Sequence, residues 1–402
     1  MKRVYDKLIK EHFKENRQML FLMGPRQVGK TTTSLDVSKI NQNSSYLNWD
    51  NQAHRLLILE GQAAVAKHLN LDTLQEKPSL VIFDEIHKFP RWRDFLKGFF
   101  DVYGKQVKIL VTGSARLDIL KFTGDSLMGR YFLYRLHPFS VREILNTKLS
   151  DKEIQPPVAI STKNLQDLFT YGGFPEPFLQ KNARFYNRWK KLRLNQLFQE
   201  DLQDISQVRE ISQLKLLAEL LQAQAGQLVN FSDLAKKIQV SSETVKRWIE
   251  TLANLYYCFT LSPWSKNNAR SLLKEPKIFL WDWGLLSDLG KKLENFVASH
   301  LLKAVHFWTD RGLGEYGLYF LRDKEKREVD FLVVKDKEPW FLVEVKSSLA
   351  KGISKNLYHF QKITGAPYAL QVVANMPYVN KDCFSQNKPI KVPLSTFLSQ
   401  LV

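Results

Sequence analysis

The stretch that most constrains the fold is a glycine loop set between an apolar run and a helix. The loop reads Gly-Pro-Arg-Gln-Val-Gly-Lys-Thr at 24–31, and the apolar run Met-Leu-Phe-Leu-Met at 19–23 precedes it. Strand, glycine loop and helix in this order are the setting of a phosphate-binding loop, because backbone N–H groups converge at a helix N-terminus. An ordinary glycine turn before a helix is the simpler interpretation, but it leaves the Lys-Thr pair at its required spacing unexplained.

Each loop position has an expected task. Gly24 and Gly29 let the backbone turn its N–H groups inward. Lys30 is expected to reach the β- and γ-phosphates, and the Thr31 hydroxyl to ligate Mg²⁺. The predicted nucleotide-binding residues are therefore Gly24, Pro25, Arg26, Gln27, Val28, Gly29, Lys30, Thr31 and Thr32.

A second stretch, Ser-Leu-Val-Ile-Phe-Asp-Glu at 79–85, is an apolar strand that ends in two acids. Asp84 is expected to hold the Mg²⁺ directly or through water, and Glu85 to polarise the attacking water as general base. Ordinary acids in the first turn of a helix are the alternative. Together with the glycine loop, the pair predicts binding of a nucleoside triphosphate. The Asn387-Lys388-Pro389 tripeptide is an incomplete guanine signature, which favours ATP over GTP.

Apolar runs at 108–114 and 131–136 predict two more strands, and their alternation with helical segments predicts a parallel sheet between helices. Ligands bind at the carboxyl ends of such strands. Ser114 is then placed to sense the γ-phosphate, although a plain strand-end serine is as good an interpretation. Arg116 and Arg130 are candidates for neutralising transition-state charge, with solvated arginines as the alternative.

The chain has 402 residues and a formal net charge of +18. That length predicts two or three domains. A surface this basic attracts polyanions, with DNA as the expected partner and anionic membranes second; a merely basic soluble protein is the alternative. Cys258 and Cys383 lack the spacing of a zinc site or a disulfide framework. The chain shows neither a signal peptide nor an apolar run of about 20 residues, so a cytoplasmic protein without a membrane span is expected.

The middle of the chain predicts helices after a linker at 146–163. The sequence Tyr-Gly-Gly-Phe-Pro-Glu-Pro at 171–177 predicts a rigid turn between two of them. Residues 181–193 then carry six Lys or Arg, no acid and three aromatic residues. Nucleic-acid contact and a solvated helix face packed through its aromatics are equally good interpretations.

Residues 226–283 have the pattern of a winged helix. A short helix at 233–238, with Ser232 as its expected N-cap, is followed by a turn and a second helix that leaves Lys246 and Arg247 outward. Two apolar strands, with the basic stretch 266–270 between them, supply the wing. This arrangement binds DNA in many proteins. A protein contact or a lid is the alternative function.

Near the C-terminus, strands at 329–334 and 340–346 are expected to pair through a five-residue turn. If Val334 lies opposite Trp340, the register places Asp330 opposite Glu344, with Lys346 on the same face. Two carboxylates this close repel unless a cation lies between them, and oxygen ligands suit Mg²⁺ or Mn²⁺. Glu294, on a preceding helix, would complete the metal site. Lys346 would orient or deprotonate a water aimed at a phosphodiester. A surface hairpin with acids spaced by chance is the alternative.

Taken together, six stretches resemble a large prokaryotic family of AAA-type P-loop ATPases with a nuclease-like C-terminal domain of unknown function. They are GPRQVGKTT at 24–32, VIFDEIHK at 81–88, VTGSAR at 111–116, SLMGRY at 126–131, YGGFPEP at 171–177 and the final EVDFLV…FLVEVK. The resemblance implies an α/β protein with four parts. These are an ATPase domain at 1–145, a helical region at 164–225, a winged helix at 226–283 and a restriction-endonuclease-like domain at 284–402.

In the nuclease pattern of that family, the acid, Asp and Glu-x-Lys positions fall on Glu294, Asp330, Glu344 and Lys346. Val329 stands where many such nucleases have proline. The resulting hypothesis is an ATPase whose nucleotide cycle controls DNA binding, and it leaves open whether the C-terminal domain cleaves DNA. The alternatives are a nuclease-silent switch that binds DNA or a protein, and an ATPase that acts on proteins or at a membrane surface. Self-association into a homo-oligomer also stays open.

Overall fold

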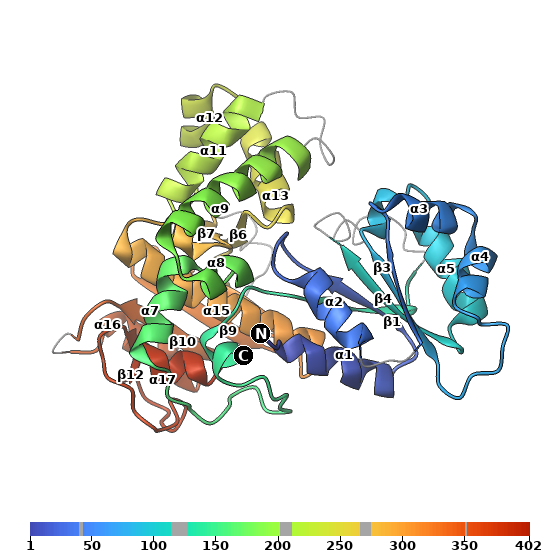
Figure 1. Cartoon of the computed structure of the whole chain (residues 1–402). Helices are drawn as coiled ribbons and strands as arrows, with labels where there is room; N and C mark the ends of the chain where they lie inside the picture. Colours follow the sequence, from blue (N-terminus) through green and yellow to red (C-terminus); the bar gives the residue numbers. More distant parts are fainter. Residues whose placement is uncertain (40–42, 114–126, 202–210, 266–274, 350–351) are drawn as a thin grey trace. The chain divides into compact units, whose positions relative to one another are not determined.

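The chain passes from its first structural unit to its second at the His137–Pro138 peptide bond. The first unit comprises Met1–His137 with Thr147–Leu149, and the second comprises Pro138–Asn146 with Ser150–Val402. The computed structural model describes residues 1–39, 43–113, 127–201, 211–265, 275–349 and 352–402 (Figure 1). Helix α6 (Val141–Leu145), which the prediction placed in the first domain, belongs to the second unit because it packs against α17 (Leu394–Ser399).

The first unit is built on a five-stranded sheet in the order β2-β3-β4-β1-β5, in which every pairing is parallel. The strands are β1 (Met19–Met23), β2 (Ser44–Asn48), β3 (Ser79–Asp84), β4 (Val107–Gly113) and β5 (Tyr131–Arg135). Strands β1 and β3 are buried along their whole length, as their uninterrupted apolar runs predict. The predicted parallel sheet is confirmed, and the carboxyl ends of β1, β3 and β4 meet at one edge.

Helices cover this sheet. They are α1 (Val4–Glu15), α2 (Lys30–Ser38), α3 (Gln52–Leu59), α4 (Gln62–His68) and α5 (Trp92–Tyr103), with a 3₁₀ turn η1 (Ile86–Lys88). The apolar stripe of α5 packs Phe95 and Phe99 edge-on against Phe83 of β3, with ring centroids 5.7 and 5.9 Å away. Helices α3 and α4 do not form one continuous helix, because Gly61 between them has φ 108° and cannot continue a helix.

The second unit begins with α6 and a set of helices. These are α7 (Thr162–Tyr171), α8 (Pro175–Gln180), α9 (Ala183–Gln196), the π-helical turn η3 (Leu197–Asp201) and α11 (Ile211–Ala223). The turn between α7 and α8 contains Gly172, which has φ 78°, and a Cβ there would lie 2.7 Å from the Asp282 carboxylate. At Gly173 a Cβ would lie 2.6 Å from the Trp283 ring. The two glycines are therefore required for close packing.

Two helices and a two-stranded antiparallel sheet follow. They are α12 (Phe231–Ile238), α13 (Ser242–Asn254), β6 (Cys258–Leu261) and β7 (Lys277–Leu280). The N-cap of α12 is Asn230, whose side chain accepts a hydrogen bond from Asp233 N, and not the expected Ser232. Ser232 lies inside the first turn, since Asn230 already satisfies an exposed helix N–H. The basic stretch 266–270 lies outside the described residues.

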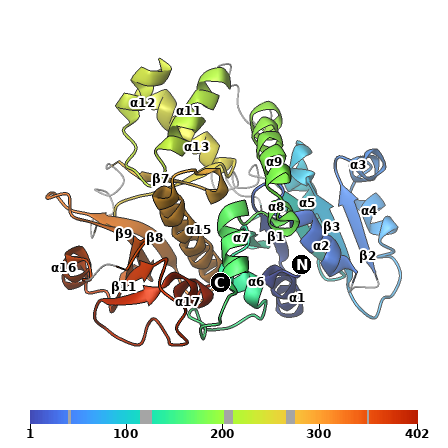
Figure 2. The same cartoon turned by 60° about the vertical axis from the view of Figure 1, so that its left-hand side comes forward.

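The rest of the second unit is a mixed sheet with helices. Its elements are η4 (Trp283–Leu285), α15 (Leu289–Asp310), β8 (Tyr316–Arg322), β9 (Glu328–Lys335), β10 (Glu338–Lys346), α16 (Lys355–Thr364), β11 (Tyr368–Val373), β12 (Ile390–Pro393) and α17. The strand order is β12-β11-β10-β9-β8. Helix α16 packs on β9, β10 and β11 through Leu357 and Phe360, and α15 packs on β8 and β9 (Figure 2).

The hairpin of β9 and β10 differs from the prediction in two ways that cancel. Its turn has two residues, Asp336 and Lys337, both with positive φ, instead of five. A bulge between Pro339 and Phe341 then shifts the pairing by one residue. As a result Val343 lies opposite Phe331, which is the pairing that the predicted register requires.

Candidate nucleotide site and carboxylate cluster

The phosphate loop has the backbone that its glycines predict. Gly29 has φ 100° and forms the N-cap of α2, while Gly24 has φ 157°. A Cβ on Gly24 would lie 2.3 Å from the Leu136 carbonyl oxygen, so only glycine fits between β1 and the end of β5. The loop therefore leaves β1 at the carboxyl edge of the sheet and ends in a helix N-terminus, the arrangement that binds phosphate.

Lys30 is buried and its ammonium is held against the loop. The Nζ atom donates hydrogen bonds to the carbonyl oxygens of Gly24 and Pro25, each 2.8 Å away. A lysine ammonium has three N–H donors and no acceptor, so it needs oxygen partners when it is buried. Phosphate oxygens are the partners of this lysine in a P-loop, and the loop carbonyls fill that role in this structure.

Asp84 joins the acidic strand to the loop. Its Oδ2 accepts hydrogen bonds from the hydroxyls of Thr31, at 2.9 Å, and Tyr46, at 2.6 Å. Its Oδ1 accepts one from the Thr112 hydroxyl. Burial, together with the hydrogen bond to Asp84, raises the pKa of Tyr46, so this phenol stays a donor. The two residues predicted to share Mg²⁺, Thr31 and Asp84, therefore lie side by side.

Tyr46 and Thr112 were not among the predicted site residues. Thr112 lies in β4, which pairs with both β1 and β3, opposite Leu22 on one side and Asp84 on the other. The sequence signal was present, because a polar residue near the carboxyl end of a buried parallel strand faces the ligand edge. Ser114, which was predicted for that task, and Arg116 lie outside the described residues.

Glu85 directly follows β3 with φ 57°, a left-handed conformation that is uncommon for glutamate. Burial raises the pKa of its carboxyl group, while the charge of Lys30 opposes that rise. Its Oε2 lies 3.6 Å from His87 Nε2 and 3.7 Å from Lys88 Nζ. A raised pKa makes this carboxylate a better proton acceptor, which suits the predicted role as general base.

Arg130 lies at the other edge of the sheet. Its carbonyl oxygen accepts a hydrogen bond from Met19 N, at the start of β1, whereas the phosphate loop follows the end of β1. Its guanidinium binds Asp101 of α5 with N–O distances of 2.8 and 3.0 Å. Within one chain the structure therefore does not bring Arg130 to the phosphate loop.

In the second unit, the acids predicted as metal ligands lie with Glu328 and Lys277 in one carboxylate cluster. Lys277 and Glu344 are buried, and the other members, Glu294, Glu328 and Asp330, are half-buried. Lys277 of β7 is 3% exposed, and its Nζ lies 3.1 Å from Glu294 and 2.7 Å from Glu328. Lys346 Nζ lies 2.7 Å from Glu344, and Asp330 accepts a hydrogen bond from Val345 N at 2.7 Å. Sequence reasoning missed Lys277, because it is far from the hairpin in the chain.

The pKa shifts link the members of the carboxylate cluster. Burial, reinforced by the charge of Glu294, raises the pKa of Asp330 to about 7, against the effect of Lys277. Burial also raises the pKa of Glu294. The Oε2 atom of Glu344 is buried and has no hydrogen-bond partner in the part of the chain that the structure describes. Among the described residues, however, no three His, Cys, Asp or Glu side chains are arranged to hold a metal ion. In this structure Glu294 pairs with the ammonium of Lys277, and the three-carboxylate metal site stays a prediction.

Two helices of the second unit present basic side chains. Helix α9 buries Tyr186 and Trp189 and exposes Arg184, Arg188 and Lys191, and its sequence contains no acid. Helix α13 has the predicted apolar stripe, because Val245, Trp248, Ile249 and Leu252 are all buried. Lys246 and Arg247 are exposed on its outer face. Across the described part of the chain, no helix is both long and apolar enough to cross a membrane.

Three family models match parts of the chain. Residues 16–145 match the AAA domain, residues 162–295 a domain of unknown function (DUF8612), and residues 289–390 another (DUF4143). With the five-stranded parallel sheet and the phosphate loop, the first match identifies residues 16–145 as an AAA-type P-loop domain. The other two matches assign no activity to the second unit.

Two relatives of this chain are described as uncharacterized proteins. One from Mycobacterium tuberculosis is 23% identical over 354 residues, which cover 84% of this chain and 72% of the relative. One from Methanocaldococcus jannaschii is 24% identical over 269 residues, which cover 63% of this chain and 58% of the relative.

Two solved structures are similar only in part. Orc1 from Aeropyrum pernix in complex with DNA is 11% identical, with a TM-score of 0.33, and covers 73% of this chain and 90% of that one. AMPPCP-bound DnaA from Aquifex aeolicus is 14% identical, with a TM-score of 0.29, and the match covers 61% of this chain and 86% of the DnaA chain. Scores at this level establish no functional relationship.

Proposed function

We propose that the protein binds and hydrolyses ATP at the phosphate loop with Mg²⁺, and that its nucleotide state controls its binding to DNA. One observation carries the enzymatic part: Asp84 accepts hydrogen bonds from both Thr31 and Thr112. Two carboxylate oxygens and a threonine hydroxyl thereby converge beside the loop, and these are the protein ligands that Mg²⁺ has in P-loop NTPases.

The residues present fit an ATP–Mg²⁺ complex. The Lys30 ammonium donates hydrogen bonds to the neutral carbonyl oxygens of Gly24 and Pro25, and phosphate oxygens are stronger acceptors for it. Thr31 and Asp84 would hold the metal, and the N–H groups at the start of α2 would bind phosphate. Mg²⁺ supplies charge neutralisation on the transferring phosphoryl group.

The chain's own residues would then divide the work of hydrolysis. Glu85 would accept the proton of the attacking water, since its raised pKa brings it nearer to working pH. Thr112 and Tyr46 would hold the Asp84 carboxylate in one orientation. Lys30 would neutralise charge that develops on the phosphates.

The DNA part of the proposal is supported by charge and by two exposed helix faces. The net charge of +18 favours a polyanionic partner. The acid-free helix α9 and the Lys246–Arg247 pair on α13 supply cations that can contact phosphates. In a winged helix, α13 would be the recognition helix.

Fluorescence anisotropy with labelled duplex DNA tests the coupling. The Glu85→Gln variant should hold ATP and hydrolyse it about 10²-fold more slowly, so it isolates the ATP-bound state. We expect its DNA affinity with ATP to differ from that with ADP by about fivefold or more, the scale of typical allosteric coupling. Identical DNA affinities with ATP, with ADP and without nucleotide would contradict the proposal that the nucleotide state controls DNA binding.

A second candidate function is metal-dependent DNA cleavage at the carboxylate cluster, with Glu294, Asp330 and Glu344 as ligands and Lys346 beside the water. The buried, unpartnered Oε2 of Glu344 favours it, because such an atom calls for a cation or a donor. Lys277 opposes it by already pairing with Glu294. Calorimetric titration with Mn²⁺, alongside a cleavage assay on several DNA forms, decides whether the carboxylate cluster is a nuclease site. Binding and cleavage that are both lost in Asp330→Ala support the candidate, and the absence of cleavage on every form leaves the nuclease-silent switch.

A further inference from the structure

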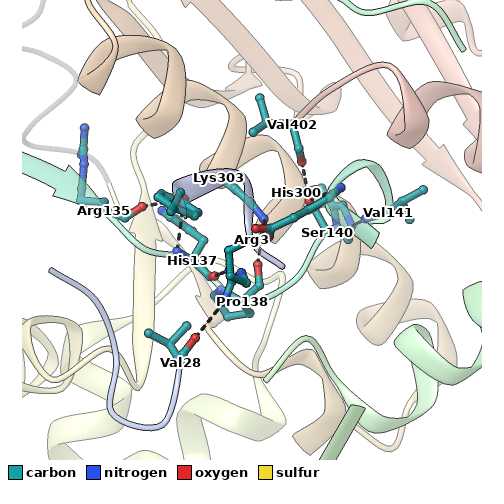
Figure 3. A network of polar contacts seen from close by, with 12 residues as sticks. Arg3, Val28, Arg135, His137, Pro138, Ser140, Val141, His300, Lys303 and Val402 are labelled. Atoms are coloured by element: carbon teal, nitrogen blue, oxygen red, sulfur yellow. Dashed lines mark hydrogen bonds and ion pairs between the residues drawn. The ribbon is translucent and has the colours of Figure 1, made fainter. Parts of the chain in front are cut away.

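Arg3 connects two segments that lie far apart in the sequence. Its side chain is 4% exposed, and its guanidinium donates to the carbonyl oxygens of Val28, at 2.9 Å, and His137, at 2.5 Å (Figure 3). The backbone of Arg3 is also fixed, because its N–H donates to Asp6 in the first turn of α1. A guanidinium is a planar fork with fixed donor directions, so it sets the distance between the two carbonyls that it binds.

The two carbonyls have different places in the molecule. Val28 belongs to the phosphate loop, is fully buried and directly precedes the N-cap glycine of α2. His137 is the last residue of the segment Met1–His137, the longer of the two segments in the first unit. The segment before His137 is fixed by Tyr5, which donates to Arg135 O at 2.7 Å and accepts from His137 N at 3.4 Å. The start of α1 therefore holds both the loop and the exit of the chain.

The next carbonyl along the chain is bound inside the second unit. Pro138 O accepts from Lys303 Nζ at 3.1 Å, and this buried lysine forms an ion pair of 2.5 Å with Glu143 (Figure 3). Phe139 N donates to Gly173 O at 2.6 Å. The proline ring locks φ at residue 138, which leaves little torsional freedom between the two bound carbonyls.

We infer that Arg3 is a positioning residue that holds the phosphate loop and transmits its state to the His137–Pro138 junction. This inference rests on the proposed ATP binding. If phosphate binding displaces Val28 O, the guanidinium of Arg3 must move with it. Otherwise the buried, charge-assisted hydrogen bond between the two groups breaks. Because the same guanidinium also binds His137 O, the peptide group between His137 and Pro138 shifts with the loop. Pro138 is the first residue of the second unit.

The test compares Arg3→Lys and Arg3→Gln with Lys7→Gln, a matched control on the exposed side of α1. Donor and acceptor dyes at Glu60→Cys and Lys388→Cys, one exposed position in each unit, report the interunit distance by energy transfer. The native Cys258 and Cys383 are buried, which protects them from labelling. ATP affinity is measured on the same samples, with Glu85→Gln included to prevent turnover.

We expect the Lys7→Gln protein to change its transfer efficiency on binding ATP, and both Arg3 variants to lose most of that change even at saturating ATP. Arg3→Lys keeps the charge but not the fork, so it should fold and bind ATP about tenfold more weakly, as for one lost charge-assisted hydrogen bond. Lys303→Met breaks the junction contact in the second unit, so it should also lose the transfer change while keeping its ATP affinity.

The outcomes separate this inference from the proposed function. If the control does not bind ATP, the proposed function fails and the inference fails with it. If the control binds ATP but its transfer efficiency does not change, or if Arg3→Lys keeps both the wild-type affinity and the wild-type change, the inference alone is overturned.

Discussion

Thr31 and Asp84 are hydrogen-bonded to each other across the carboxyl edge of the parallel sheet, with the hydroxyl oxygen 2.9 Å from Oδ2. The two residues come from segments that are not neighbours in the sheet, because β4 lies between β1 and β3. Thr112 of β4 holds the other oxygen of the same carboxylate. The carboxylate of Asp84 in β3 is therefore held by Thr31 of α2 and Thr112 of β4, and we expect Thr112 to contribute to turnover.

Replacing Thr112 with valine tests that consequence. The change removes the hydroxyl from Asp84 Oδ1 at nearly constant volume, so the sheet should keep its packing. We expect ATP turnover to fall about tenfold, since one charge-assisted hydrogen bond is lost, with a smaller effect on ATP affinity. Steady-state kinetics and calorimetry measure the two quantities. Thr73→Val, at an exposed position before the start of β3, is the control, and a Thr112→Val enzyme as fast as this control would exclude the role.

The basic face of α13 predicts a specific salt dependence of DNA binding. In the double variant Lys246→Ala, Arg247→Ala, the slope of log Kd against log salt should fall by up to about 2, with about 0.9 for each lost phosphate contact. The control removes the same charge from Lys324 and Lys326, which are exposed in the turn between β8 and β9. An unchanged slope in the α13 variant, or an equal loss in the control, would mean that α13 does not contact DNA phosphates.

His300 predicts how stability changes with pH. Burial lowers the pKa of its imidazole to about 3, and the neutral ring accepts from Val141 N and donates to Phe296 O. Because the unfolded chain takes up the proton near pH 6.5, the contribution of His300 is complete above that pH and is lost as the pH falls toward 3.

Urea denaturation at pH 7.5 and pH 5 checks this prediction. The free energy of unfolding of the wild type, minus that of His300→Gln, should be smaller at pH 5 because glutamine does not titrate. A difference that is the same at both pH values would mean that His300 is not buried in its neutral form.

Lys277 predicts a strong dependence of stability on one buried cation. Lys277→Met leaves Glu294 and Glu328 facing each other without their shared partner, which should cost about 3 kcal/mol at pH 7. The cost should grow as the pH rises, because burial raises the pKa of Glu294 and its carboxyl group then ionises. Lys237→Met is the control, because its exposed pair with Asp233 is worth well under 1 kcal/mol. Equal melting temperatures of the two variants would contradict the carboxylate cluster as described.

The hairpin of β9 and β10 illustrates how far the sequence could predict the fold. Alternation of side chains predicted correctly that Asp330 and Glu344 belong at corresponding positions, since a wrong parity would turn a buried face outward. The tight turn and the bulge were not predicted. The short turn shifts the pairing of the two strands by one residue, the bulge shifts it back, and the alternation of side chains beyond the bulge is therefore the same as without either feature.

Residues brought in by tertiary structure could not be predicted in the same way. Thr112 could have been found from its place near a strand end, but Arg3 and Lys277 have no spacing relative to any motif. Each is a buried cation whose partners lie far away in the chain, so only the folded structure identifies it. Glu294 was found from the sequence, yet its cation in this structure is Lys277.

The most direct measurement of the central claim is ATP binding and turnover in wild type, Lys30→Ala and Glu85→Gln, each assayed with Mg²⁺. Lys30→Ala should weaken ATP binding, because the phosphates lose their ammonium partner. Glu85→Gln should bind ATP nearly as well as wild type but hydrolyse it about 10²-fold more slowly, the scale of a lost general base. Equal affinity and equal turnover in all three proteins would contradict hydrolysis at this site.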